Sequence, residues 1–300
     1  MSLYKGSNYC FLDPPNGNDL YAGKSWRKPK ATYASATGLV SDYGNITIFV
    51  SPAGYHNVDI TGEMKTINLV GNPRPGSPYW LGYGLDGNPA TTDPIIDFKG
   101  SSPMNSLKVR GFIIGTSISG KPALRFNYGT GSMTSENGAE NCSLLMNNTN
   151  QNLIEVGDGL GWKAKISNNI LMQFGGDVTG SHLVRSYSTV PCVVPFLIRN
   201  CAMVFVADAA PSTYLKEADM HYVDPGSQDN VQYYNCAWLR GNLDGSYTLM
   251  TQKDAYPSTA LRKDPNPMTV YDFNKLAFPG GGGGSAEVIK FIRSLQRLGG

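Results

Sequence analysis

The sequence predicts an all-β protein, a right-handed parallel β-helix (solenoid) with a short N-terminal cap and a C-terminal amphipathic helix on a Gly-rich linker. Segments with one shared pattern recur along the chain, and turn-forming residues punctuate it. There are 35 Gly and 19 Pro in 300 residues, yet 41% of the residues are hydrophobic. This mixture favours many short strands around a core over long helices. We divide the chain into a strand, turn and capping segment (1–40), the β-helix body (41–279), the linker (280–285) and the helix (286–300).

The repeated segments each place a pair of small or polar residues before alternating apolar residues. They read SLKVRGFIIG (106–115), GAENCSLLMN (138–147), KISNNILMQF (165–174), LIRNCAMVFV (197–206) and QYYNCAWLRG (232–241). Aligned on Gly111, Cys142, Asn169, Cys201 and Cys236, they lie 31, 27, 32 and 35 residues apart, and Gly71 in a related segment lies 40 residues before Gly111. Constant strands joined by loops of unequal length are typical of a β-solenoid.

Stacking such coils predicts two columns of like residues. The first is a ladder of amide side chains that hydrogen-bond along the stack, formed by Asn141, Asn168, Asn200 and Asn235. The second is a column of buried, reduced thiols, Cys142, Cys201 and Cys236, with Asn169 among them. A metal-binding column is the alternative, but it requires convergent His or carboxylate ligands that these segments lack. The five cysteines also lack a CxxC pair or zinc spacing, so we expect no metal and no cofactor.

The charge of the chain is concentrated in its last segment. Residues 286–300 hold Lys290, Arg293 and Arg297 against Glu287, which accounts for the whole net charge of +2 and leaves 22 basic and 22 acidic residues elsewhere. Binding to a phosphate backbone depends on clustered Lys and Arg, so a neutral body argues against a nucleic-acid partner. The N-terminal residues MSLYKGSNYCFL lack the basic start and apolar run of a signal peptide. We therefore expect synthesis in a host cytoplasm.

The N-terminal quarter resembles the start of pectin-lyase-like right-handed β-helix proteins. The turn motif Asp-Pro-x-x-Gly-x-Asp, followed by Gly-x-Ser-Trp, matches Asp13, Pro14, Gly17, Asp19, Gly23, Ser25 and Trp26. The next part of the likeness comprises Pro29, Thr32, Ile48, Phe49, Val50, Pro52, Gly54, Tyr55 and 67–71. The resemblance implies the fold, with the region from Thr32 to Leu39 covering the open end of the solenoid. It does not imply one function, because this fold hosts lyases, hydrolases, adhesins and phage spikes.

No catalytic set is singled out by the sequence. A glycoside hydrolase needs two carboxylates, and the acidic candidates are Glu136, Glu140, Glu155, Asp158, Asp177, Asp208, Glu217 and Asp219, with no pair selected by spacing. No residues match the calcium-binding carboxylates and proton-accepting base that the resemblance implies for lyases. The histidines His56, His182 and His221 are interpreted as structural residues.

An aromatic loop lies between the first two coils. Residues 72–94 are rich in Pro and Gly and carry Tyr79, Trp80 and Tyr83. Such rings stack on sugars or anchor a protein interface, and the sequence leaves both roles open.

The C-terminal segment predicts a short amphipathic helix on a flexible tether. Ser285 is a suitable N-cap, and an apolar stripe is formed by Val288, Phe291, Ile292, Leu295 and Leu298. A helix of this length is marginal alone, so we expect it to dock on another structural protein, on copies of itself or, least favoured, on a membrane surface. The glycines closed by Ser285 also resemble an artificial linker, and an appended peptide is the alternative.

These observations together predict a non-catalytic structural or recognition subunit of a virion-like assembly, such as a spike, fibre or decoration protein on the virion surface. Its expected partners are its own copies in a homotrimer, another structural protein and a surface polysaccharide; the homotrimer rests on the resemblance to viral β-helices. The alternative is a polysaccharide lyase or glycoside hydrolase of the tailspike type. A cellular adhesin is a third hypothesis.

Overall fold

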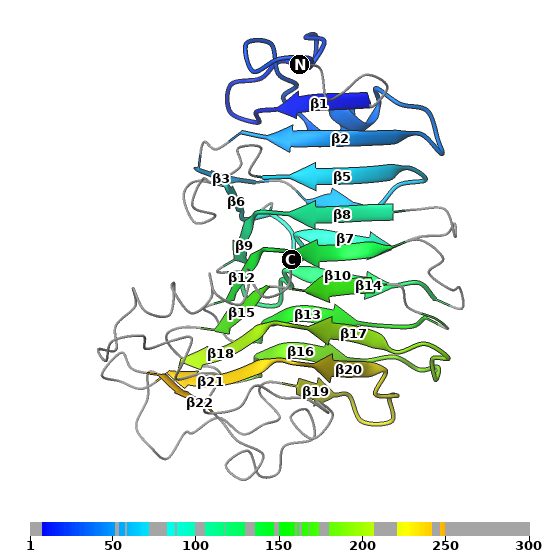
Figure 1. Cartoon of the computed structure of the whole chain (residues 1–300), viewed down its shortest axis with the longest axis vertical. Coiled ribbons are helices and arrows are strands. Elements are labelled where there is room, and N and C mark those ends of the chain that lie inside the picture. The colour runs from blue at the N-terminus through cyan, green and yellow to red at the C-terminus, as the bar shows by residue number, and fades with distance from the viewer. Residues whose placement is uncertain are drawn as a thin grey trace.

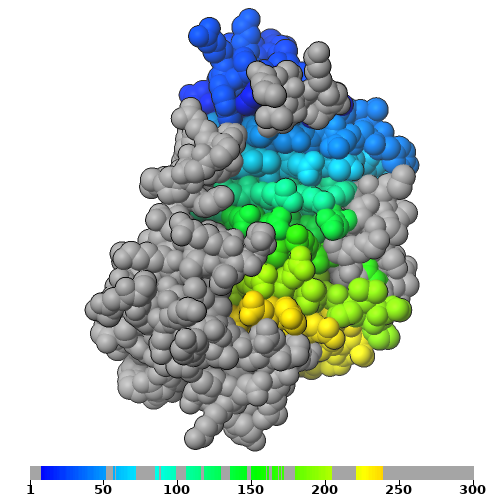
Figure 2. All heavy atoms as spheres, in the orientation of Figure 1, coloured from blue at the N-terminus to red at the C-terminus, as the bar shows by residue number. Residues whose placement is uncertain are grey.

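The chain forms a parallel β-helix of three sheets, which confirms the predicted fold class (Figure 1). The computed structural model describes residues 8–51, 54–57, 59–71, 83–87, 89–99, 106–116, 118–129, 136–146, 150–159, 161, 164–167, 169–173, 180–206, 221–241 and 247–249. Each coil contributes one strand to each sheet in turn, and the coils stack along the long axis of the molecule (Figures 1 and 2). The predicted C-terminal helix lies outside the described residues.

Parallel neighbours within each of the three sheets come from successive coils. Sheet A runs β1 (Asn8–Leu12), β2 (Asn45–Val50), β5 (Thr66–Val70), β8 (Ser106–Arg110), β11 (Asn137–Glu140), β14 (Ala164–Ser167), β17 (Phe196–Arg199) and β20 (Val231–Tyr234). Sheet B runs β3 (Gly54–His56), β6 (Tyr83–Leu85), β9 (Ile113–Thr116), β12 (Ser143–Met146), β15 (Ile170–Gln173), β18 (Ala202–Val206), β21 (Ala237–Gly241) and β22 (Tyr247–Leu249). Sheet C runs β4 (Ile60–Thr61), β7 (Ile96–Lys99), β10 (Leu124–Asn127), β13 (Asn152–Val156), β16 (His182–Ser186) and β19 (His221–Val223). Among these strands only β21 and β22 pair antiparallel.

A two-residue turn joins sheet A to sheet B in successive coils. Its first residue has a left-handed backbone, with φ of 74° at Gly111, 56° at Asn141, 52° at Asn200 and 53° at Asn235. Gly and Asn are the residues that adopt this conformation at least cost, which explains why they recur at this place in the repeat. The second residue is buried; these residues are Phe112, Cys142, Asn169, Cys201 and Cys236.

Inward-facing side chains form continuous apolar columns because the strands pair without a change of register. On sheet A the column reads Cys10, Ile48, Leu69, Val109, Ala139, Ile166, Ile198 and Tyr233, all essentially buried. On sheet C, Phe98 stacks on Phe126 with ring centroids 4.2 Å apart and planes at 4°. The last of these coils differs, since His221, Tyr233 and Trp238 replace aliphatic residues of the preceding coil, Val184, Ile198 and Met203.

The motif on which the resemblance rests ties the N-terminal segment to itself. Asp19 accepts hydrogen bonds from the backbone N–H of Ala31 and Thr32, both at 2.9 Å, and from the Thr32 hydroxyl at 2.8 Å. Thr32 in turn caps the helix α1 (Tyr33–Thr37). A side chain at Gly17 would come within 2.2 Å of the carbonyl oxygen of Lys30, so only glycine allows this close packing.

Among the described residues no helix is long and apolar enough to cross a membrane.

The left-handed turn generates a stability prediction at Asn141. We expect Asn141→Val to lower the free energy of unfolding by about 1–2 kcal/mol, because a β-branched side chain is strained at φ 56°. Asn141→Gly should change it by less than about 0.5 kcal/mol. Urea denaturation would measure both variants, with Gln232→Val on the exposed face of β20 as a control for the added valine. Equal stabilities of the Val and Gly variants would contradict the role assigned to the turn.

Candidate functional site

The outer face of sheet C carries a column of side chains whose charges alternate in sign. The strand register places Asp97 of β7 beside Arg125 of β10, Arg125 beside Glu155 of β13, and Glu155 beside Arg185 of β16. Tyr222 of β19 follows Arg185. Each strand therefore contributes its central outward residue to one line across the sheet, and neighbours of opposite charge favour this register.

The arginines of this column make close, paired contacts with carboxylates. Arg125 Nη2 lies 2.6 Å from Asp97 Oδ2, and Arg125 Nε donates to Asp97 Oδ1 at 3.4 Å. Arg185 Nε and Nη2 donate to the two oxygens of Asp224 at 2.8 and 2.7 Å. Hydrogen bonding to Asp97 and to Asp224 raises the pKa of Arg125 and Arg185 respectively above the ordinary arginine range. These are bidentate, charge-assisted pairs.

Arg185 also connects Asp224 to Glu155. Its Nη1 lies 3.5 Å from Glu155 Oε1, and the same oxygen accepts a hydrogen bond from Asn152 Nδ2 at 2.8 Å. The Arg185 side chain is 36% exposed, whereas the side chains of Glu155 and Asp224 are 12% and 24% exposed. One arginine thus holds two carboxylates that lie 69 residues apart in sequence, through contacts that span 30 and 39 residues.

Tyr187 borders this cluster. A side chain at Gly157 would come within 2.8 Å of the Tyr187 ring, so the absence of a Cβ lets the ring lie close over the end of β13. The Tyr187 ring centroid is 5.8 Å from Arg185 Cζ, and its hydroxyl accepts a hydrogen bond from Asn127 at 3.5 Å. Burial raises the pKa of Tyr187 to about 12, so it is a neutral phenol near pH 7.

An open cleft lies at the end of the charged column, over β13, β16 and β19. It has a volume of about 500 Å³ and is lined by Asn150, Asn152, Gly180, His182, Arg185, Tyr222, Asp224 and Pro225. The rings of His182 and Tyr222 stack with centroids 4.5 Å apart and planes at 15°. Burial, with Arg185 as a second cause, lowers the pKa of His182 to about 4. The cleft therefore has two stacked aromatic rings beside a bidentate ion pair.

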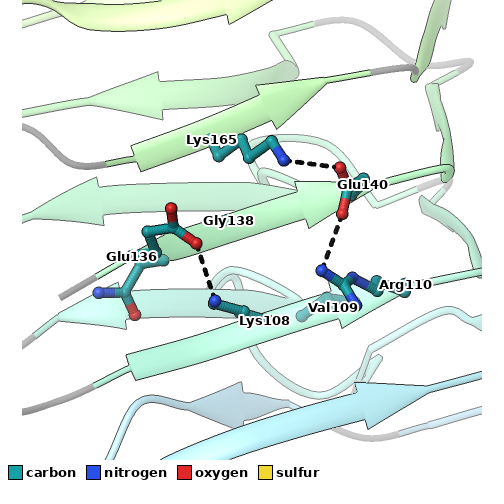
Figure 3. Close-up of a pocket in the computed structure, with 8 residues that line it drawn as sticks. Lys108, Val109, Arg110, Glu136, Gly138, Glu140 and Lys165 are labelled. Atoms are coloured by element: carbon teal, nitrogen blue, oxygen red, sulfur yellow. Dashed lines mark hydrogen bonds and ion pairs between the residues drawn. The ribbon is translucent and has the colours of Figure 1, made fainter. Parts of the chain in front are cut away.

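The outer face of sheet A has a second charged group, shown in Figure 3. Glu140 bridges Arg110 and Lys165 at 3.0 and 2.9 Å, and Lys108 pairs with Glu136 at 2.8 Å. The hollow between these residues has a volume of only about 10 Å³, which is room for about one water molecule. We conclude that this group ties neighbouring coils together and is not a ligand site.

The structure describes only some of the residues predicted from the sequence. Asn141, Asn200 and Asn235 occupy the first turn position after β11, β17 and β20, and Asn235 donates to Asn200 at 2.9 Å. Cys142, Cys201 and Cys236 are buried and make no disulfides. Tyr83 begins strand β6 of sheet B, whereas the sequence placed it in a loop. Asn168, Tyr79, Trp80 and the helix residues Val288, Phe291, Ile292, Leu295 and Leu298 lie outside the described residues.

Sequence reasoning missed most of the cleft. It included Glu155 among many acidic candidates, treated His182 as structural, and did not select Asp97, Arg125, Arg185, Tyr222 or Asp224. A signal was present in the sequence. A charged residue stands between two residues that face the core in each of the segments IDF, LRF, IEV and VRS, and these charges are 28, 30 and 30 residues apart. The repeats were aligned on the turn between sheets A and B. Because the loops that follow differ in length, the sheet C strands of successive coils were not brought into alignment.

The described residues contain no group of His, Cys, Asp and Glu arranged to hold a metal ion.

Comparison with known proteins gives one distant structural likeness. No protein-family model matches the sequence, and no curated protein matches it. A solved structure, the pectin methylesterase of Aspergillus niger, is similar over 87% of this chain and 90% of its own, with 11% sequence identity and a TM-score of 0.45. At that level the likeness carries no conclusion about activity.

The lowered pKa of His182 generates a prediction about pH. The unfolded chain protonates this residue near pH 6.5 and the folded protein only near pH 4, so stability should fall as the pH falls through this window. His182→Gln should lose less stability over the same window, as measured by urea denaturation near neutral pH and near the folded-state pKa. An NMR titration of the imidazole with its midpoint near the ordinary histidine value would contradict the assignment.

Proposed function

We propose that the protein is a non-catalytic structural and recognition subunit that binds a glycan in the cleft on the outer face of sheet C. One observation carries the proposal: the stacked His182–Tyr222 rings lie beside the bidentate Arg185–Asp224 pair in an open cleft of about 500 Å³. Pockets for small ligands typically combine an apolar surface with a few placed polar groups.

Sugars present two kinds of surface, and the cleft has a counterpart for each. The C–H faces of a pyranose ring pack on flat aromatic surfaces, a role that suits Tyr222 and His182. Sugar hydroxyls both donate and accept hydrogen bonds, a role that suits carboxylate, guanidinium and amide groups such as Asp224, Arg185 and Asn152. The shallow, open form of the site fits part of a longer chain of sugars on a surface.

The use of the carboxylates supports recognition over catalysis. Glycoside hydrolysis requires one carboxyl group that gives a proton and another that acts as base or nucleophile. Both Glu155 and Asp224 accept hydrogen bonds from the same guanidinium of Arg185. This arrangement fixes the side chains as a rigid polar surface, which is suited to binding.

The setting that we propose is the surface of a virion-like assembly, with the chain acting as a spike, fibre or decoration subunit. The support is the resemblance of residues 13–71 to the start of β-helix proteins that include phage spikes. In this setting the chain forms a homotrimer, and residues 286–300 dock on another structural protein.

Glycan binding tests the recognition role. A panel of defined oligosaccharides, followed by calorimetry on those that bind, should show an affinity that falls about tenfold in Tyr222→Ala, because its stacking surface is lost. Tyr234→Ala is the matched control: this ring is 47% exposed on the outer face of sheet A, and its loss should leave affinity unchanged. Failure of every glycan to bind would overturn the proposal. Release of oligosaccharides from a bound polysaccharide would replace it with the depolymerase alternative.

The proposed anchor is tested at the apolar stripe of residues 286–300. Phe291→Asp combined with Leu295→Asp should leave the β-helix folded, by circular dichroism, and abolish incorporation into the assembly. Burying such side chains contributes roughly 1.5–3 kcal/mol each before ordering costs. Lys290→Asp, on the opposite face of the expected helix, is the control that should assemble. Normal assembly of the double variant would favour an appended peptide.

A further inference from the structure

We infer that the glycan taken by the sheet C cleft is a neutral one, and that the Arg185–Asp224 pair discriminates against acidic sugars. This inference rests on the proposed glycan-binding function and names its ligand class. Two observations support it. The only described cation that lines the cleft, Arg185, is paired with carboxylates, and the geometry fixes which groups of Asn152 and His182 donate and accept hydrogen bonds.

The charged residues that line the cleft give no excess positive charge. Arg185 contributes one positive charge and Asp224 one negative charge, and Arg185 also pairs with Glu155, which lies outside the lining. His182 is neutral above its pKa of about 4. Among the described residues that line the cleft there is no lysine. An anionic ligand would therefore meet no positive charge that is not already paired with a carboxylate.

Arg185, the only described cation lining the cleft, is committed to its carboxylates. Three of its five N–H donors are used, two of them in the bidentate pair with Asp224. At the two remaining N–H groups a uronate or sulfate would share one guanidinium with two carboxylates, and it could take this fork only by displacing Asp224. The displaced carboxylate would then lie unpaired beside Glu155 and the anion, and like charges brought together in this way reject a ligand.

A sugar hydroxyl can bind in the cleft without disturbing the Arg185–Asp224 pair. The donor and acceptor roles of Asn152 and His182 are fixed one after the other, starting from Glu155. The Glu155 carboxylate only accepts, so the Asn152 amide must direct its NH₂ group to it, at 2.8 Å. Asn152 Oδ1 therefore faces His182 Nδ1 at 2.9 Å, and Nδ1 must carry the proton of the neutral imidazole. The other ring nitrogen, Nε2, is then an acceptor suited to a sugar O–H, while the two remaining N–H groups of Arg185 suit sugar oxygens.

The test compares ligand classes and then alters the pair. Wild-type protein would be titrated with matched neutral, uronate-containing, sulfated and amine-bearing oligosaccharides. We expect binding of neutral sugars, with uronate and sulfated ones weaker by at least about tenfold. Equal or tighter binding of the acidic sugars, or binding confined to the cationic amino sugars, would overturn the inference while leaving the glycan-binding proposal intact. Absence of binding by every class would overturn both.

Asp224→Asn isolates the charge. It raises the summed charge of the described residues that line the cleft from 0 to +1, so the affinity for acidic relative to neutral sugars should increase about fivefold, and less at high salt. Glu140→Gln removes the same charge from the outer face of sheet A and should leave the ratio unchanged. An unchanged ratio in a folded Asp224→Asn variant, checked by circular dichroism, would count against the pair as the discriminating element. If that variant does not fold, the wild-type comparison of ligand classes decides alone.

Discussion

The structure depends on one constraint, the register in which each coil lies directly under its neighbour. From β8 onward the turn between sheets A and B maintains it, because a left-handed residue followed by a buried one lets the chain leave sheet A and enter sheet B in the same way. A one-residue slip in any strand would send apolar side chains outward and charged ones inward. The repeated Gly or Asn at this turn therefore serves the register of all the coils from β8 onward.

The same register builds the interior and the candidate site together. Because strands pair parallel and in step, each residue meets its equivalent in the coils on either side. Inside, like meets like, as in the stacked rings of Phe98 and Phe126. Outside, on sheet C, opposite charges meet, and Arg185 holds carboxylates contributed by Glu155 and Asp224 of the flanking coils. The cleft is formed where this column ends in aromatic rings in place of another charge.

The sequence was sufficient to predict the fold because the turn before sheet B has a visible marker. Asn141, Asn200 and Asn235 each precede a cysteine, and that pair locates the coils without knowledge of their spacing. Sheet C has no such marker, since its strands are identified only by a charged residue between two residues that face the core. Asp224 could not have been assigned at all, because it lies beyond β19 and reaches Arg185 through a side-chain conformation that no spacing encodes. The loop assignment was wrong for Tyr83, which begins β6, while Tyr79, Trp80 and the C-terminal helix remain predictions.

The alternation of charge on sheet C has a consequence for how such a protein can change its length. Solenoids grow and shrink by duplication or loss of whole coils, and the interior columns, which repeat every coil, tolerate a change of one. The outer column of Asp97, Arg125, Glu155 and Arg185 repeats every two coils. Excision of the coil that carries Arg125 would bring two carboxylates side by side, and duplication of it would bring two guanidiniums together. The outer face of sheet C thus repeats every two coils, whereas the core repeats every coil. Only the gain or loss of an even number of coils keeps opposite charges side by side on that face.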